Sequence, residues 1–360
     1  MDDFLVLADE LLRIPSTADR PEELARALDF VLDVVGPGCT VERFESGGKP
    51  SALVYRGRER VPFRVIFNAH LDVVPGSPEQ FRPRRAGSRL YARGAQDMKL
   101  SALVLASVFR DVPTTFPVAL QLVTDEEVGG RDGTLHQLER GVTARFAVIG
   151  EHSGLRLVTE SKGLATARVS AVGLAAHGAY PWLGDNAVVK LVRAVDALLA
   201  AYPPPTEEQW RTTVNVARIG TANTAVNQVP ADATAWLDIR FPPEDGDFAG
   251  RDAAAVAAHL SAVCGLPVEV LHVEPPHRAA RDGVDVRALR AAARAQGYSG
   301  EFLRKHGAAD SRFFHRHGVD AVIFGIGGDG QHGPDEYADL DTVEPYRRAL
   351  ADYLGSLPDA

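Results

Sequence analysis

Four short apolar segments, three ending at a histidine or an acidic residue and one leading into a loop that carries a histidine, constrain the fold more than any other feature of this chain. VIFNAH ends at His70, LQLVTDEE ends at Glu126 and Glu127, and AVIGE ends at Glu151. The fourth segment, DAVIFGI, leads into the loop GGDGQHGPDEY, which carries His332. Continuous apolar runs of this length are typical of strands buried on both faces, as in parallel sheets covered by helices.

Helical patterns separate these strand-like segments. Apolar residues recur at helical spacing in five places, at 3–13, 21–35, 97–112, 284–296 and 309–317. We expect the third of these helices to begin at Asp97, because an aspartate commonly caps a helix. Alternation of helices with buried strands predicts an α/β fold with a largely parallel sheet.

The pattern changes between residues 161 and 274. LATARVSAVGL, TVNVARIG and TAWLDIRF alternate apolar with polar residues, as half-exposed antiparallel strands do. Two helical segments accompany them, one at 186–202 with Asn186 as its cap and one near 251–263. The sequence therefore predicts a parallel-sheet domain formed by 1–160 plus 275–360, with an α+β domain inserted at 161–274.

Composition excludes several classes of protein. The 360 residues are 45% hydrophobic and carry a formal net charge of −9, which argues against a nucleic-acid partner. No apolar stretch reaches the length of a membrane helix, so we expect no membrane partner. Cys39 and Cys264 are the only cysteines, which excludes a disulfide scaffold and favours the cytoplasm.

The strand ends predict a metal site. In an open parallel sheet the carboxyl ends of the strands share one edge, where ligands bind. Histidines and carboxylates gathered there suit Zn²⁺, Mn²⁺ or Co²⁺. One residue of the pair Glu126 and Glu127 can bind metal while the other is a general base, although an acidic pair alone is more often a solvated loop. Asp72, two residues after His70, can hold the ring N–H of that histidine and fix its tautomer.

Five motifs in order, HLDVVP, RGAQDMK, TDEEVGG, IGE and HGPDEY, together with SKGLATARVSAVGLAAHGAYP in the insert, resemble the di-zinc aminoacylase family. That family includes acetylornithine deacetylase, succinyl-diaminopimelate desuccinylase and glutamate-releasing carboxypeptidases. The resemblance covers most of the chain. It implies that the insert is a lid and dimerisation domain, and that the protein is a homodimer through that domain.

The resemblance also implies a ligand set. Two divalent ions, zinc with cobalt or manganese as alternatives, would be held by His70, Asp97, Glu127, Glu151 and His332. Asp97 would bridge the ions and form a cis peptide bond with Met98. Glu126 would be the base that activates a metal-bridging water.

Further positions match residues that contact the substrate in the family. His177 would stabilise the oxyanion, often from the partner protomer, and Asn227, Arg240 and Arg312 would hold the substrate. Isolated residues of these types also commonly have structural roles. The chain departs from the family pattern at three positions, with Leu100 after DMK, His152 after Glu151 and Ala309 before Asp-x-Arg. The last removes a hydroxyl near the substrate.

The predicted function is hydrolysis of the amide bond of a small N-acyl amino acid or dipeptide. Alternatives are an exopeptidase of the same family and a non-catalytic relative that binds metal or a small acid. A nucleotide-dependent enzyme, suggested by FGIGGDG at 324–330, is disfavoured because no helical pattern follows the glycines.

Overall fold

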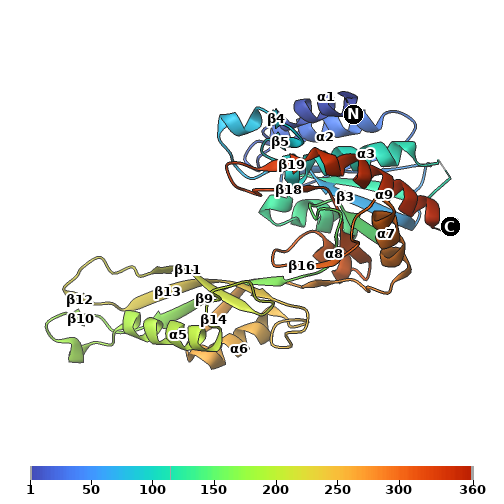
Figure 1. Cartoon of the computed structure of the whole chain (residues 1–360). Coiled ribbons are helices and arrows are strands. Elements are labelled where there is room, and N and C mark those ends of the chain that lie inside the picture. Colours follow the sequence, from blue (N-terminus) through green and yellow to red (C-terminus); the bar gives the residue numbers. More distant parts are fainter. Residues whose placement is uncertain (1, 114, 358–360) are drawn as a thin grey trace. The chain divides into compact units, whose positions relative to one another are not determined.

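The chain forms two compact units, as seen in a computed structural model that describes residues 2–113 and 115–357 (Figure 1). The first unit comprises Met1–Thr159, Arg278–Arg304 and Ala309–Ala360. The second comprises Glu160–His277 and Lys305–Ala308. The second unit thus begins and ends near the limits of the predicted insert.

The short segment Lys305–Ala308 belongs to the second unit, whereas the sequence placed it in the first. The Lys162 N–H donates to the Lys305 carbonyl oxygen at 3.1 Å. The ring of His306 lies edge-on to the ring of Trp210, with centroids 5.4 Å apart. These contacts join residues more than 90 positions apart, so local sequence patterns do not reveal them.

A mixed sheet forms the centre of the first unit. Its order is β1-β2-β6-β3-β7-β17-β8-β15, with β16 paired to β8. The central strands β6, β3, β7 and β17 are parallel, as predicted, and the flanking pairs β1–β2, β2–β6 and β17–β8 are antiparallel. The strands span Thr40–Ser46 (β1), Lys49–Tyr55 (β2), Phe63–His70 (β3), Val118–Val123 (β6), Ala144–Ile149 (β7), Leu157–Ser161 (β8), His277–Arg278 (β15), Phe302–Lys305 (β16) and Asp320–Ile323 (β17).

Helices cover both faces of this sheet. Ile66 of β3 belongs to one apolar cluster, with Phe313 and Phe314, while its neighbour Phe67 belongs to the other, with residues of α1, α2, α3, α7 and α9. Successive strand residues point to opposite faces, which explains why β3 is apolar throughout. The helices span Asp2–Leu12 (α1), Pro21–Val35 (α2), Leu100–Asp111 (α3), His136–Glu139 (α4), Val284–Ala295 (α7), Ser311–Arg316 (α8) and Val343–Ser356 (α9).

The third helix does not begin at Asp97, as the sequence suggested. Regular helix starts at Leu100, and the backbone dihedral angles of Asp97 and Met98 are not helical. Asp97 caps nothing with its side chain. The peptide bond between Asp97 and Met98 is cis, as the family resemblance implied.

A small antiparallel sheet carries the loop that contains His332. Its order is β18-β19-β5-β4, and no sequence pattern indicated this sheet. The strands are only three residues long, too short for a periodic pattern to appear. They span Arg84–Ala86 (β4), Arg89–Tyr91 (β5), Gly327–Asp329 (β18) and Tyr337–Asp339 (β19).

The second unit is an antiparallel sheet with α5 and α6 packed against it. β13 alternates buried and half-buried residues along its whole length, as predicted for this region. The Asn186 side chain accepts from the Val189 N–H at 3.1 Å and caps α5, also as predicted. The elements span Gly163–Val172 (β9), Ala176–His177 (β10), Ala187–Ala201 (α5), Thr213–Gly220 (β11), Gln228–Val229 (β12), Asp232–Phe241 (β13), Ala253–Cys264 (α6) and Val268–Glu274 (β14).

Short helical turns complete the two units, at Pro78–Phe81, Glu126–Val128, Arg131–Leu135, Pro181–Leu183 and Leu340–Thr342. Across residues 2–113 and 115–357, no helix combines the length and apolar character needed to span a bilayer.

Candidate functional site

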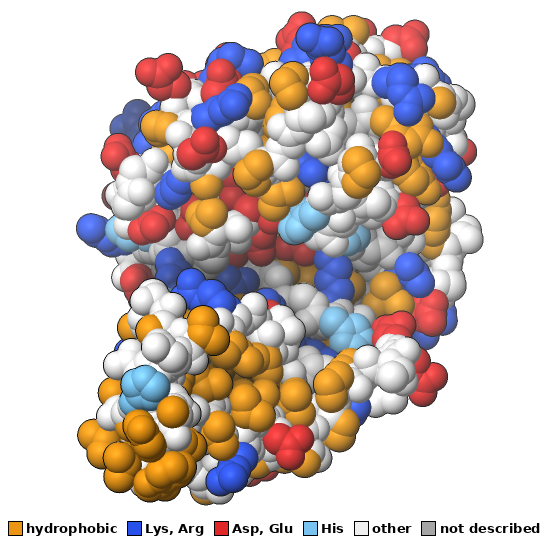
Figure 2. Space-filling view, turned by 90° about the vertical axis from the view of Figure 1, so that its left-hand side faces the viewer, with side chains coloured by type: hydrophobic (Ala, Val, Ile, Leu, Met, Phe, Trp, Pro, Cys, Tyr) orange, Lys and Arg blue, Asp and Glu red, His pale blue; other side chains and the backbone are white. Residues whose placement is uncertain are grey.

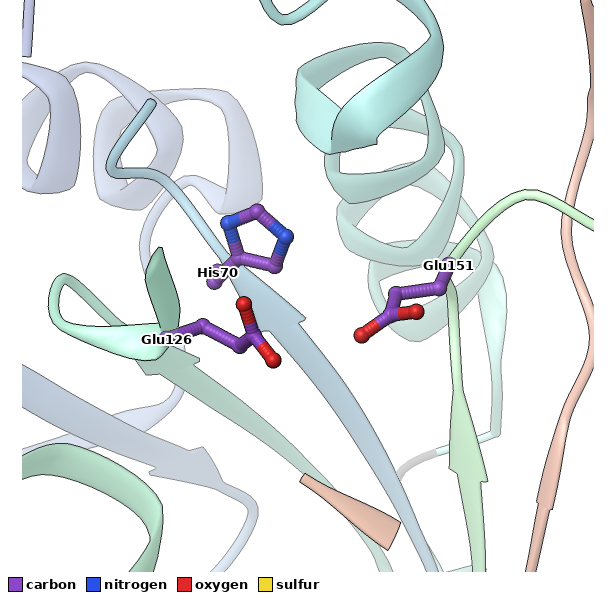
Figure 3. A group of neighbouring side chains, drawn as sticks. All are labelled: His70, Glu126 and Glu151. Carbon is purple, nitrogen blue, oxygen red and sulfur yellow. The ribbon is translucent and has the colours of Figure 1, made fainter. Parts of the chain in front are cut away.

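The ends of the parallel strands bring two groups of potential metal ligands together in the first unit. In each group the ligand atoms lie within 4.8 Å of one another. The first group is His70 at the end of β3, Glu126 after β6 and Glu151 after β7, whose side chains converge in Figure 3. The second group is Asp97, Glu127 and His332.

Asp97 connects the two groups. Its Oδ1 lies 3.0 Å from His70 Nε2, and its Oδ2 lies 3.5 Å from His332 Nε2. Each carboxylate oxygen therefore faces one histidine. Burial opposes ionisation of Asp97, but its interactions with His332 and His70 hold the pKa of this carboxyl well below its usual range. An ionised carboxylate with one oxygen toward each group suits a bridging ligand.

The pair Glu126 and Glu127 occupies a tight turn, so both side chains reach the same region rather than opposite faces of a strand. Burial raises the pKa of Glu126 well above its usual value, and the nearby charge of Glu151 adds to this shift. Burial likewise raises the pKa of Glu127 to about 7. A buried carboxylate with a raised pKa is a stronger base than an exposed one.

Asp72 fixes the position of this turn. Its Oδ1 accepts from the Glu126 N–H at 3.2 Å, and its Oδ2 accepts from the Glu127 N–H at 2.9 Å. The Nδ1 atom of His70 lies 3.0 Å from the backbone carbonyl oxygen of Asp72 and 3.5 Å from its carboxylate. The His70 ring is thus hydrogen-bonded to the backbone of Asp72. The Asp72 carboxylate instead accepts from the backbone N–H groups of Glu126 and Glu127. Asp72 is fully buried.

The other side of the turn is held by Asp310 and Arg312. Arg312 is 4% exposed, and its Nη2 donates to the Gly129 carbonyl oxygen at 2.8 Å. Asp310 accepts from the Thr134 hydroxyl at 2.5 Å, and burial raises the pKa of Asp310 to about 6. The structure therefore gives Arg312, which the sequence assigned to substrate binding, a backbone contact beside the glutamate pair.

Sequence reasoning missed two residues that hold Asp97 in place. Glu336 Oε1 accepts from the backbone N–H groups of Gln96 and Asp97, at 3.1 and 3.2 Å. Arg93 Nη1 donates to Glu336 Oε2 at 2.5 Å, and both side chains are buried. Both residues lie within motifs already noted, RGAQDMK and HGPDEY, but no local pattern pairs positions 243 residues apart.

The residues present fit a pair of divalent cations. Buried carboxylates cost free energy unless cations or hydrogen bonds compensate them. Four carboxylates, those of Asp97, Glu126, Glu127 and Glu151, belong to the two groups, and each group contains one imidazole. Mixed nitrogen and oxygen ligands of this kind are those that zinc, cobalt and manganese accept.

The remaining predicted site residues lie in the second unit. His177 is exposed on β10, and Gln228 of β12 is its partner across the strand pair. The adjacent Gly178 N–H donates to the Asn227 carbonyl oxygen at 2.6 Å, so Asn227, which directly precedes β12, lies close to the end of β10 that carries His177. Arg240 lies on β13, where its Nε donates to Asp238 Oδ1 at 2.8 Å.

This α/β fold, with paired groups of histidine and carboxylate ligands at the strand ends, defines a metal-dependent hydrolase. The chain belongs to Peptidase family M20/M25/M40, whose profile matches residues 66–356. The sequence is similar to succinyl-diaminopimelate desuccinylases of Cereibacter sphaeroides, at 29% identity covering 98% of this chain and 99% of the relative. A protein of the same name from Acidiphilium cryptum is 30% identical, covering 99% and 98%.

The fold also matches solved structures. A metallo-carboxypeptidase of the M20 family from Sulfolobus solfataricus superimposes with a TM-score of 0.75. The two proteins are 18% identical, and the match covers 98% of this chain and 99% of that one. At this identity the likeness concerns the fold.

Proposed function

We propose that this protein hydrolyses the amide bond of a small N-acyl amino acid or dipeptide, with Glu126 as general base. The observation that carries the proposal is the position of Glu126. It is a half-buried carboxylate of raised pKa, its backbone N–H donates to the Asp72 carboxylate, and it belongs to one of the two groups of potential metal ligands.

The residues that would hold the ions are His70 and Glu151 for one, His332 and Glu127 for the other, and Asp97 for both. When bound, such ions polarise the substrate carbonyl and favour ionisation of a nearby water. We propose zinc, with cobalt or manganese as alternatives, because all of these accept mixed nitrogen and oxygen ligands.

Glu126 accepts a proton from water as the water oxygen bonds to the amide carbon. It then delivers that proton to the amide nitrogen as the carbon–nitrogen bond breaks. The products are a carboxylic acid and an amine, and Glu126 is again a carboxylate. Burial raises the pKa of Glu126, which makes it a stronger base for the first transfer.

His177 is proposed as the donor to the oxyanion. Its Nδ1 accepts from the Ala179 N–H at 3.1 Å, so the neutral ring carries its proton on Nε2. That Nε2–H group is therefore available to a developing negative charge. Asn227, Arg240 and Arg312 are proposed to hold the substrate.

The second unit is proposed as a dimerisation domain. Its exposed apolar residues are numerous for a monomer's surface, and Figure 2 shows hydrophobic side chains crowded over the lower part of the view, which this unit forms. The exposed large apolar residues of this unit include Val172, Leu174, Tyr180, Trp182, Leu183, Val189, Val192, Ile219, Val226 and Leu271. A symmetric pairing of two copies would cover such a surface.

We also propose a cytoplasmic location, because Cys39 and Cys264 are both free thiols.

The name shared by the sequence relatives favours a deacylase, and the carboxypeptidase with the same fold supports the exopeptidase alternative. The two are separated by assaying metal-loaded protein with N-acetyl and N-succinyl amino acids beside dipeptides. Release of amine from N-acyl amino acids supports the deacylase. Cleavage of peptides alone supports the exopeptidase.

Glu126→Gln tests the mechanism. General base catalysis contributes roughly 100- to 10,000-fold, so we expect kcat to fall by that factor with both ions still bound. Glu10→Gln, which changes an exposed glutamate of α1, is the matched control. Two metals per chain without turnover of any substrate in the wild type would instead support a non-catalytic binding protein. Failure to bind any metal after reconstitution would overturn the proposal.

A further inference from the structure

An apolar recess lies in the first unit beside one of the two ligand groups. Its volume is about 300 Å³. The apolar part of its wall is formed by Ala18, Val73, Val74, Pro75, Phe81 and Val128. None of these residues has a part in the site described above. The size and lining are those of a pocket for a small organic group.

The recess is continuous with the proposed active site, because Glu127 lines both. Val128 follows Glu127 directly and is 58% exposed, although it is apolar. Val73 follows Asp72, whose carboxylate holds the Glu127 N–H at 2.9 Å. The wall of the recess is therefore built on the same two segments that position the ligands.

The position of Glu126 indicates which side of the substrate would face the recess. Glu126 returns the proton to the leaving nitrogen, and it belongs to the group with His70 and Glu151. The nitrogen side of the amide therefore lies toward that group. The acyl side then faces Glu127 and the recess next to it.

Charge decides the kind of acyl group that fits. Apart from Glu127, the charged residues of the wall are Asp19 and Arg20, adjacent in sequence and opposite in sign. The Asp19 carboxylate accepts from the Thr17 hydroxyl at 2.5 Å, and hydrogen bonding there lowers the pKa of Asp19, which keeps it ionised. The recess thus offers no net positive charge to a second carboxylate. Its wall suits an uncharged hydrocarbon chain instead.

We propose that this recess is the acyl-binding pocket and that it selects neutral, aliphatic acyl groups over succinyl. The inference rests on the proposed function, since it assigns the acyl side of that amide substrate. The proposed acyl preference would differ from that of relatives named for a succinyl substrate. Specificity then resides in the segments 17–20 and 73–76, together with Phe81 and Val128.

The test is a series of N-acyl derivatives of one amino acid, carrying acetyl, butyryl, hexanoyl or succinyl groups. Each fully buried methylene should raise kcat/KM about fourfold, so hexanoyl, with four methylenes more than acetyl, should exceed acetyl by up to about 250-fold. Butyryl and succinyl have equal numbers of carbon atoms, and butyryl should be preferred. Equal or higher kcat/KM for succinyl would overturn the proposal.

Variants of the wall locate the effect. Ala18→Phe fills the recess and should lower the hexanoyl-to-acetyl ratio of kcat/KM about tenfold. Val61→Phe, at a valine 51% exposed and outside the recess, should leave the ratio unchanged. Val128→Ser makes the wall more polar without filling the recess, and it should also lower the hexanoyl-to-acetyl ratio. A ratio unaffected by both Ala18→Phe and Val128→Ser would also overturn the proposal.

A binding measurement separates this inference from the proposed function. Hexanoate should raise the Tm of the metal-loaded protein at lower concentration than succinate, and Ala18→Phe should abolish the difference. Hexanoate binding without turnover of any amide would contradict the proposed function but support the pocket. Turnover of amides with no preference for N-hexanoyl substrates, and no preferential binding of hexanoate, would contradict the pocket but not the proposed function.

Discussion

Asp72 shows how a single buried residue can control a site without binding the ion or the substrate. Its two carboxylate oxygens accept from the N–H groups of Glu126 and Glu127, and its backbone oxygen contacts the ring of His70. The proposed base and two of the proposed ligands therefore depend on one side chain and its backbone. Partners of this kind fix the orientation of ligands that would otherwise rotate.

Asp72→Asn should disturb this arrangement with little change in volume. The amide keeps one acceptor oxygen but turns an NH₂ group toward the second backbone N–H, which then loses its partner. We expect kcat/KM to fall roughly 10- to 100-fold, with weaker binding of the ion held by Glu127. Steady-state assays and metal content measured after dialysis would show both effects.

The control for this substitution is Asp33→Asn, because Asp33 is an exposed aspartate of α2. It should leave both activity and metal content unchanged. If Asp72→Asn retained full activity and both ions, the turn that carries the glutamates would be held by other contacts, and Arg312 would be the next residue to test.

Residues at strand ends could be predicted from the sequence, while those that hold them could not. His70, Glu126 and Glu151 each follow an apolar run, and parallel strands bring such positions to one edge. Glu336 and Arg93 follow no such rule. Their contacts to one another and to Asp97 join positions about 240 residues apart and depend on a small sheet with three-residue strands.

Some helices and strands could likewise be predicted from the sequence, and others could not. Amphipathic spacing predicted α1, α2, α5 and α7 closely, because each packs one apolar face on a sheet or helix. The predicted start of α3 was wrong, because Asp97 and Met98 have non-helical dihedral angles and regular helix begins at Leu100. Asn68, which interrupts the apolar run of β3, is explained by a buried chain of hydrogen bonds to Gln121 and Thr134, both at 2.9 Å.

The C-terminal helix α9 provides a test of pH dependence at the scale of one element. Glu344 accepts hydrogen bonds from Arg347 and Arg348, at 2.8–2.9 Å, and these bonds lower the pKa of Glu344 to about 2. In the unfolded chain a glutamate has a pKa of about 4.3. The folded state therefore holds the carboxylate more strongly, and the stabilisation is present above the unfolded pKa and is lost as pH falls toward 2.

Glu344→Gln should lower the free energy of unfolding by roughly 0.5 kcal/mol at pH 7, the usual scale for exposed pairs. The difference between variant and wild type should shrink as pH falls from about 5 to 2. Urea unfolding at several pH values measures it, and the charge-neutralising Glu10→Gln on α1 serves as control. A difference that stays constant down to pH 2 would contradict the assigned pKa.

At the scale of the whole molecule, the division into two units separates the ligand groups from His177. The proposed ligands all lie in the first unit, and His177 lies in the second. The sequence leads us to expect two domains, because buried strands give continuous apolar runs while half-exposed strands alternate apolar with polar residues. Residues 305–308 belong to the second unit because of tertiary contacts. Such contacts leave no periodic pattern in the sequence.

Dimerisation through the second unit is open to a direct test. Val189 and Val192 lie three residues apart on α5 and therefore share one face, on which Val192 is 57% exposed. The wild type should have twice the chain mass in sedimentation experiments at micromolar concentration. Val192→Glu should shift it to a monomer, because a charge cannot be buried unpaired in an apolar interface. Val284→Glu, at an equally exposed valine of α7 in the first unit, should remain a dimer.

The same variant tests where His177 acts. If this histidine reaches the active site of the partner protomer, the monomeric Val192→Glu protein should keep its two ions and lose turnover, since none of the metal ligands lies in the second unit. His177→Ala in the dimer should show the same loss without dissociation. Mixing inactive Glu126→Gln with inactive His177→Ala should then restore part of the activity, because one active site of each mixed dimer would contain both residues. A fully active monomer would place His177 at the site of its own chain.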